Sequence, residues 1–284
     1  MDRIIELLED NNLNNSKQDS LILWELQENR KRIDIIKNAS TSKIYEEVNI
    51  YLKEKQLSMK ETLEYIEKNK LSFSRFGDGE LKLMLRNDYN LKFQKNSENI
   101  QVDLKNCLNS KVENLLIGFS NVYHDLHWAS VYADIWFEIK PMLINHNVFG
   151  HAHVSRPLFF LTMGQDGVDL WRKIWDDKDI TIITGQSSRF DAIDALFDNA
   201  KTINYMYSVP KNAYDDLPRI LDEIQNNQSE LFLISLGPAG TILTFELAKL
   251  GKWAIDIGHI NSSYENVFED KLWPEKLKIK IEKQ

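Results

Sequence analysis

The sequence has almost no cysteine and no long apolar run. Its 284 residues include a single cysteine, Cys107, which rules out an internal disulfide and is the usage typical of a reducing compartment. No apolar run reaches the roughly 18 residues that a membrane-spanning helix needs. The charged start, Met1-Asp2-Arg3, lacks the apolar core of a signal peptide. We therefore expect a cytoplasmic protein with no membrane span.

The chain carries less positive than negative charge. The 35 Lys and Arg residues are outnumbered by 43 Asp and Glu residues, which gives a net charge of −8 and a pI near 5.4. This balance argues against a broad surface for nucleic acid or for anionic membrane. A small anionic ligand stays compatible with it, because a few local cations are enough to hold a phosphate.

Glycine and proline are absent from the first 70 residues. Apolar residues there recur at helical spacing, as Ile44, Val48 and Leu52 do. The run from Ser58 to Glu61 predicts a capping box at a helix start. We expect three or four helices, and an α-helical N-terminal extension over residues 1–60. This extension either packs as an appendage or mediates homo-oligomerisation.

From about residue 71 the pattern changes to short β-rich runs that alternate with helical segments. The six candidate strands are Leu71–Arg75, Leu115–Ser120, Asn147–His151, Ile180–Thr184, Leu231–Ser235 and Lys252–Asp256. Helical patterns lie between most of them, for example over 127–146, 213–227 and 240–250. Such alternation predicts an α/β fold with a Rossmann-like, mostly parallel sheet and helices on both faces.

Ligands of an open parallel sheet bind beyond the carboxyl ends of its strands. We therefore expect the ligand-binding residues to follow the strands directly. Four of these strand exits are rich in Gly, Asp, Arg or His. They are Arg75–Glu80, Thr184–Arg189, Leu236–Gly240 and Asp256–His259. Four such exits in one domain predict a shared site.

The first exit carries two carboxylates, Asp78 and Glu80, flanked by Gly77 and Gly79. Carboxylate oxygens are hard ligands that suit Mg²⁺ or Mn²⁺, and these ions complete their shells with water and substrate phosphates. The flanking glycines allow a close backbone approach to a ligand. The alternative interpretation is a surface turn followed by a helix with acidic residues in its first turn.

The third exit is a candidate phosphate site. A strand runs into Gly237-Pro238-Ala239-Gly240 and then into a helix, whose free N–H groups and dipole favour a diphosphate. The alternative is an ordinary strand-to-helix turn with proline near the first helical position. The two interpretations are equally compatible with the sequence.

Further polar residues lie beside the other exits. Arg156 and Arg189 match the geometry of a pyrophosphate. His259 and Glu265 are placed to orient an acceptor and take its proton, although a structural histidine and a solvated surface charge are the alternatives. No Cys or His cluster completes a zinc site.

These motifs occur together and in order along the chain. The runs Ser74–Glu80, Ser155–Pro157, Ser188–Phe190, Leu236–Ala239 and Asp256–His259, with Tyr264 and Glu265, resemble the GT-D family of bacterial glycosyltransferases, formerly called domain of unknown function 1792. The resemblance runs from about Glu61 to about Glu269. It implies a Rossmann-like transferase domain, which we assign to residues 61–284.

The resemblance also implies a chemistry. A UDP-sugar, carrying glucose or another hexose, would donate to a saccharide or glycoprotein acceptor in bacterial surface glycan synthesis. Asp78 and Glu80 would hold Mn²⁺ or Mg²⁺, Glu265 would be the catalytic base, and His259 would lie beside it. The expected donor contacts are Arg75, Gly77, Arg156, Arg189, Gly237, Pro238, Ala239 and Asp256.

A base on the acceptor side predicts inversion at the anomeric carbon. Two alternatives stay open. One is a metal-dependent phosphohydrolase that uses the same carboxylates, and the other is a nucleotide-binding scaffold without catalysis.

Overall fold

The structure is a computed structural model that describes residues 17–120 and 126–277. The chain divides into two units. One comprises Met1–Ile50 and Val122–Trp136, and the other comprises Tyr51–Asn121 and Phe137–Gln284. No helix in the described part of the chain has both the length and the apolarity needed to cross a membrane.

The first unit contains most of α2 (Lys17–Lys53) and most of α6 (Leu126–Ile139). Over residues 17–70 the chain forms two helices, α2 and α3 (Met59–Asn69), and residues 1–16 lie outside the described residues. α2 continues for 37 residues because no glycine or proline interrupts it. Several large apolar side chains of α2 are exposed, among them Ile35 and Ile36.

The second unit is built on a seven-stranded sheet whose strands are all parallel, in the order β3-β2-β1-β7-β6-β4-β5. The strands are β1 (Ser72–Phe76), β2 (Leu115–Phe119), β3 (Gly150–His151), β4 (Asp179–Gly185), β5 (Thr202–Ser208), β6 (Leu231–Ser235) and β7 (Ala254–Asp256). The predicted Rossmann-like sheet is confirmed.

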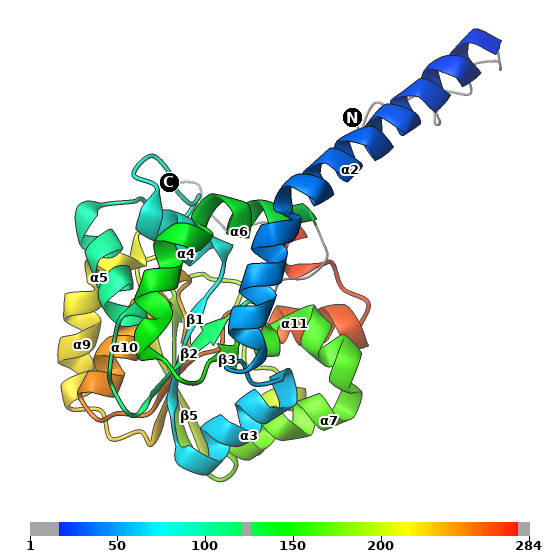
Figure 1. Cartoon of the computed structure of the whole chain (residues 1–284). Helices are drawn as coiled ribbons and strands as arrows, with labels where there is room; N and C mark the ends of the chain where they lie inside the picture. The colour runs from blue at the N-terminus through cyan, green and yellow to red at the C-terminus, as the bar shows by residue number, and fades with distance from the viewer. Residues whose placement is uncertain (1–16, 121–125, 278–284) are drawn as a thin grey trace. The chain divides into compact units, whose positions relative to one another are not determined.

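Helices cover both faces of this sheet (Figure 1). One face carries α5 (Glu98–Leu108), α9 (Leu217–Gln225) and α10 (Pro238–Lys249). The other carries α3, α7 (Pro157–Trp175) and α11 (Ile260–Phe268). The shorter elements are α4 (Asp78–Leu85), α8 (Asp194–Phe197), η1 (Lys140–Asn145), η2 (Ala152–Ser155), η3 (Ala213–Asp216) and η4 (Pro274–Lys276).

The six predicted strands all exist, although the third is reduced to Gly150–His151. The seventh strand, β5, was not predicted. It lies at the edge of the sheet, and most of its side chains are exposed or half-exposed. The predicted capping box is confirmed: Ser58 N–H donates to Glu61 Oε2 at 2.9 Å, and Glu61 N–H donates to Ser58 Oγ at 3.2 Å.

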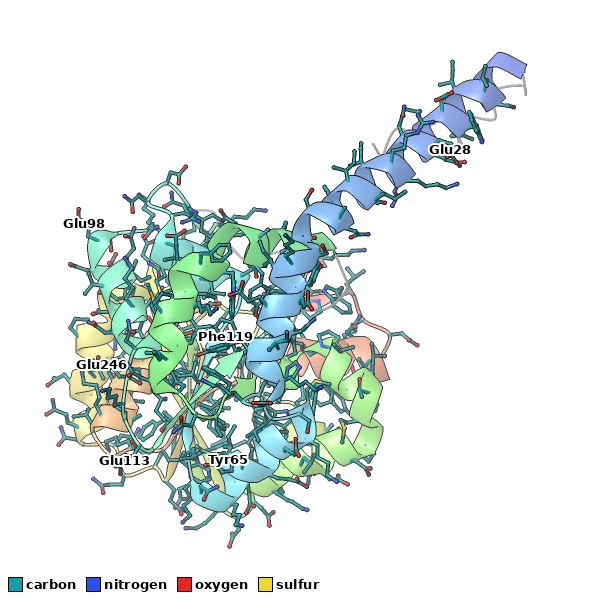
Figure 2. All side chains as sticks on the ribbon, in the orientation of Figure 1. Glu28, Tyr65, Glu98, Glu113, Phe119 and Glu246 are labelled. Carbon is teal, nitrogen blue, oxygen red and sulfur yellow. The ribbon has the colours of Figure 1, made fainter. Side chains whose placement is uncertain are left out.

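The core of the second unit lies between the sheet and the α3, α7 and α11 layer. Trp171 and Trp175 stack with ring centroids 5.6 Å apart, and both are fully buried. Phe119 is likewise buried at the end of β2, whereas Glu98 lies at the exposed start of α5 (Figure 2). The core fixes the strands rigidly, so the residues that follow them are held in defined positions.

Candidate active site

The carboxyl ends of the central strands meet at one edge of the sheet. β1, β7 and β6 are parallel neighbours that end at Phe76, Asp256 and Ser235. Strands β1 to β3 extend to one side of β7, and β6, β4 and β5 extend to the other. Open α/β sheets bind ligands where the strand order reverses in this way. This edge is therefore the candidate site.

Asp78 and Glu80 occupy the first turn of α4, directly after β1. The N-cap residue is Gly77, whose N–H donates to Glu80 Oε2 at 2.9 Å. Acidic side chains are favoured there by the free N–H groups and the helix dipole. The Asp78 side chain is 39% exposed, and its Oδ2 lies 4.0 Å from Lys82 Nζ. Glu80 thus caps the helix while Asp78 reaches solvent.

The pKa of the Glu80 carboxyl group is raised above its usual value. Burial of this group raises its pKa to about 7, and the negative charge of Asp256 adds to the effect. The Gly77 N–H and the positive charge of Arg75 act in the opposite direction. Part of the residue reaches the surface, but the carboxyl group itself lies among protein atoms. A cation beside it would favour the ionised form.

Arg75 and Asp256 form a buried ion pair between β1 and β7. Arg75 Nη2 donates to Asp256 Oδ1, and Arg75 Nε donates to the Asp256 main-chain oxygen, both at 2.8 Å. Asp256 Oδ1 also accepts from the Gly258 N–H at 3.0 Å. The Thr241 hydroxyl lies 3.5 Å from Asp256 Oδ2. The pair therefore has the additional hydrogen bonds that a desolvated ion pair needs.

The same guanidinium contacts the residues that follow β3. Arg75 Nη1 donates to Ser155 Oγ at 2.8 Å and to the Ala152 main-chain oxygen at 3.3 Å, both in η2. Arg75 and Asp256 were predicted as donor contacts. The structure uses the Arg75 guanidinium for four hydrogen bonds that hold three strand exits together, and donor contact by this pair stays a prediction.

Arg156 is a second arginine whose charge interacts with the two carboxylates of α4. It is the N-cap residue of α7 and is half-buried. Burial and the charge of Arg75 lower its pKa to about 10, whereas Asp78 and Glu80 act to raise it. Arg156 therefore lies within electrostatic range of both acidic side chains of α4. This position suits the predicted role on a pyrophosphate.

Arg189 has a different environment. Its Nη1 donates to the main-chain oxygens of Pro274 and Leu277 at 2.9 and 2.8 Å. The Arg189 main-chain oxygen accepts from Asn261 Nδ2 at 3.2 Å. Arg189 therefore anchors the segment after α11, and a pyrophosphate contact by this residue stays a prediction.

His259 lies among these cations. It precedes α11 as the N-cap residue, without a side-chain capping bond. Burial lowers its pKa to about 3, and the charges of Arg156, Arg189 and Arg75 act in the same direction. The imidazole is therefore neutral at physiological pH and lies within electrostatic range of three arginines.

Two more neutral histidines border the site. The His153 N–H donates to His151 Nδ1 at 3.2 Å, and the ring centroids are 5.5 Å apart. Burial lowers their pKa values to about 4 for His151 and about 3 for His153. Within residues 17–120 and 126–277, no three His, Cys, Asp or Glu side chains group as a metal site. A metal at Asp78 and Glu80 would thus need ligands from water or substrate.

The turn before α10 has the predicted form, with Pro238 at the first helical position. The N–H groups of Gly240 and Thr241 both donate to the Gly237 main-chain oxygen, at 2.7 and 3.3 Å. Pro238 and Ala239 are buried, whereas Gly237 is partly exposed. An anion would approach this turn at Gly237, and binding there stays a prediction.

Glu265, the predicted base, lies on α11 six residues after His259. Its carboxylate is 19% exposed and forms an ion pair of 2.7 Å with Lys271 Nζ. Lys271 Nζ also lies 3.1 Å from Glu269 Oε2. To accept a proton from a substrate, Glu265 would have to exchange this partner.

Two residues contribute hydrogen bonds to the site although the sequence analysis assigned them no role: Ser155 and Gly258. Ser155 was noted only as part of a motif, and its hydrogen bond to Arg75 depends on the packing of β3 beside β2. Gly258 carries φ of +49°. Its position after a strand was a usable signal, because glycine is favoured at such angles.

Comparison with known proteins identifies relatives over most of the chain. Residues 73–284 match the family model described as glycosyltransferase GT-D fold. A relative named probable glycosyl transferase Gly, from Streptococcus gordonii, is 30% identical over 224 residues, which is 74% of this chain and 32% of that protein. Glycosyltransferase GlyD, from Streptococcus pneumoniae serotype 4, is 26% identical over 218 residues, 72% of this chain and 26% of that protein. The chain therefore spans a third or less of the length of these relatives.

Solved structures share the fold. One is described as showing that the highly conserved domain of unknown function 1792 has a distinct glycosyltransferase fold. It matches with a TM-score of 0.72 at 27% identity, over 85% of this chain and 88% of that one. Another, described as a new glycosyltransferase from Streptococcus sanguinis, matches with a TM-score of 0.68 at 26% identity, over 76% and 85% of the two chains.

Proposed function

The chain belongs to the glycosyltransferase GT-D fold family, and from this membership we propose that it transfers a sugar from a nucleoside diphosphate to an acceptor hydroxyl. The donor is a UDP-linked hexose such as glucose. The acceptor is a saccharide or a glycoprotein, and the anomeric configuration is inverted. The names of the relatives support the transferase activity.

One observation carries this proposal. Two acidic side chains of α4, Asp78 and Glu80, lie within electrostatic range of the half-buried cation Arg156 at the carboxyl edge of the sheet. This arrangement suits a nucleoside diphosphate. Its phosphates can bind the arginine directly, and a divalent metal can link them to the carboxylates.

The residues present fit a divalent metal. Asp78 and Glu80 supply two oxygen ligands, which is the protein share usual for Mg²⁺ bound with substrate phosphates. Burial disfavours the ionised Glu80 carboxyl group, and a divalent cation would offset this cost. When bound, the ion supplies charge stabilisation for the departing diphosphate.

The protein's own residues perform the remaining tasks. Arg156 neutralises charge that develops on the diphosphate. Glu265 accepts the proton of the acceptor hydroxyl as that oxygen bonds to the anomeric carbon. The bond from the anomeric carbon to the phosphate oxygen breaks, and its electron pair leaves with the nucleoside diphosphate. The neutral His259 orients an acceptor or donor hydroxyl by hydrogen bonding.

The decisive experiment incubates the purified protein with a panel of nucleotide sugars, with Mn²⁺ or with EDTA. Release of UDP from one UDP-sugar, lost with EDTA and with the Asp78→Ala/Glu80→Ala variant, would support the proposal and identify the donor. Release of inorganic phosphate would instead indicate the phosphohydrolase alternative. Binding of a nucleotide without turnover in the presence of varied acceptors would favour the scaffold alternative.

A further inference from the structure

A segment with no role in the sequence prediction connects α4 to α5. We call residues 86–97 the crossing segment. Its turn is closed by the Leu91 N–H, which donates to the Gln94 main-chain oxygen at 3.0 Å, and by the reverse bond at 3.3 Å. Asn96 Nδ2 donates to the Leu83 main-chain oxygen in α4 at 3.0 Å and to that of Arg86, the C-cap residue of α4, at 2.8 Å. These bonds fix the segment to α4.

The turn of the crossing segment is anchored separately to the residues after β5. The Phe93 main-chain oxygen accepts from the Asn212 N–H at 2.8 Å. Asn212 Oδ1 accepts from the Lys95 N–H at 2.9 Å, and Gln94 Oε1 accepts from the Tyr214 N–H at 3.2 Å. The segment therefore spans from α4 to η3 and is tied down at both places.

Side chains of the crossing segment contact two of the strand exits. A Cβ atom on Gly79, in the first turn of α4, would lie 3.7 Å from Leu91 Cδ1. A Cβ atom on Gly237 would lie 2.8 Å from the Phe93 ring. Gly237 also has φ of +57°, so glycine is needed there for both reasons. The segment thus joins the carboxylate turn to the turn before α10.

Tyr89 brings an aromatic ring to the carboxylates themselves. Lys82 Nζ lies 5.7 Å from the centroid of the Tyr89 ring and 4.0 Å from Asp78 Oδ2. Burial, followed by the charges of Asp78 and Glu80, raises the pKa of the Tyr89 phenol. Its hydroxyl is therefore protonated at neutral pH and able to donate a hydrogen bond, and it lies within electrostatic range of both acidic side chains.

We propose that the crossing segment is a wall of the donor site, in which the Tyr89 hydroxyl donates a hydrogen bond to the diphosphate of the donor. Phe93 acts as a positioning residue, because its ring packs on Gly237 and fixes the turn before α10. The proposal rests on the proposed function. The geometry supports it in two places: Lys82 Nζ lies between the Tyr89 ring and Asp78, and the Phe93 ring lies over Gly237.

Tyr89→Phe tests the hydrogen bond because it removes the hydroxyl and keeps the ring. We expect the KM for the UDP-sugar to rise about tenfold, as for a lost hydrogen bond to a charged group, with kcat changed less than about twofold. The affinity for UDP with Mn²⁺, measured by calorimetry, should fall by the same factor. Tyr65→Phe is the matched control, since it makes the same change at a tyrosine of α3 that is 41% exposed and lies outside the crossing segment. Wild-type KM and UDP affinity in Tyr89→Phe would overturn the assignment of Tyr89.

Phe93 is tested by two substitutions. Phe93→Ala empties the space over Gly237 and should weaken UDP binding about tenfold, whereas Phe93→Tyr keeps the ring and should restore it to within about twofold. Equal binding by Phe93→Ala and wild type would overturn the role of Phe93. If wild-type protein binds no nucleotide at all, the proposed function fails and this inference fails with it. If wild type binds and both Tyr89→Phe and Phe93→Ala bind equally well, only the inference fails.

Discussion

The guanidinium of Arg75 lies directly against the α-carbon of Gly258. A methyl group at that position would stand 2.1 Å from Arg75 Nη2, and Gly258 already has φ of +49°. Gly258→Ala should therefore displace the guanidinium from Asp256 and lower the free energy of unfolding by about 3–5 kcal/mol, the usual cost of breaking a buried ion pair. Urea denaturation measures the change.

Gly251→Ala is the matched control for Gly258→Ala. Gly251 also has positive φ, at +72°, but no atom lies within 4 Å of its added Cβ. Its substitution should cost only the backbone strain, about 1–2 kcal/mol. Equal destabilisation by the two variants would show that the Arg75 contact contributes nothing.

Binding of Mn²⁺ should depend on the nucleotide. Asp78 and Glu80 are two ligands only, so we expect weak Mn²⁺ binding to the protein alone and at least a tenfold gain when UDP is present. Titration calorimetry with and without UDP measures this gain. Asp78→Asn should abolish it, whereas Glu64→Gln, at an exposed position of α3, should leave it intact. Tight binding without UDP would contradict the two-ligand site.

Glu265 and Glu269 provide a matched pair of variants, because both carboxylates lie near Lys271 Nζ. If Glu265 is the base, Glu265→Gln should lower kcat by at least about a hundredfold, since general-base catalysis contributes that much or more. Glu269→Gln should change kcat less than about twofold. A similar small effect of both substitutions would remove Glu265 from the mechanism.

Acid should weaken the fold through its buried histidines. Burial lowers the pKa of His151 to about 4, while in the unfolded chain it is about 6.5. Below pH 6.5 the unfolded state binds a proton that the folded state excludes. The free energy of unfolding therefore decreases as the pH is lowered. Between pH 7 and pH 5 this residue alone should cost about 2 kcal/mol.

The measurement for His151 is urea denaturation of wild type and His151→Gln at both pH values. The glutamine does not titrate, so the variant should lose about 2 kcal/mol less than wild type over this interval. An identical loss in the two proteins would show that the imidazole takes up its proton in the folded state.

The exposed apolar side chains of α2 lead us to propose self-association through that helix. Ile22, Ile33 and Ile36 share one face of α2 and are 48%, 41% and 65% exposed. Light scattering after size exclusion should show an oligomer that Ile22→Lys/Ile36→Lys converts to a monomer. Ile144→Lys, at a 76% exposed site of the second unit, is the control. A monomeric wild type would exclude the proposal.

The sequence predicted the parts of the fold that depend on local pattern. Continuous apolar runs such as Leu231–Ser235 became central strands, and Ser58 with Glu61 formed the expected cap. The strand β5 was not predicted, because it lies at the sheet edge, where polar and aromatic residues replace an apolar run. The length of α2 was not predicted, because helical spacing of apolar residues is the same in one long helix and in several short ones.

The same division holds at the candidate site. Asp78, Glu80, Arg156 and His259 could be predicted to lie at one edge of the sheet, because parallel strands end together. In the structure, the charges of these residues act on one another. Whether Arg75 contacts ligand or protein depends on where Asp256 and Ser155 lie, and pattern does not specify that. Phe93 and Gly237 are 144 residues apart in the chain, so their contact was beyond any local signal.

The position of β7 has a consequence for the order in which the chain is made. Strands β1 to β3 are complete by His151, and β4 to β6 are complete by Ser235, yet the two groups join only through β7 at Ala254–Asp256. A nascent chain on the ribosome therefore holds two half-sheets without their connecting strand until residues 254–256 are made. Assembly of the active edge, with Arg75 from one half and Asp256 from β7, must await the synthesis of β7.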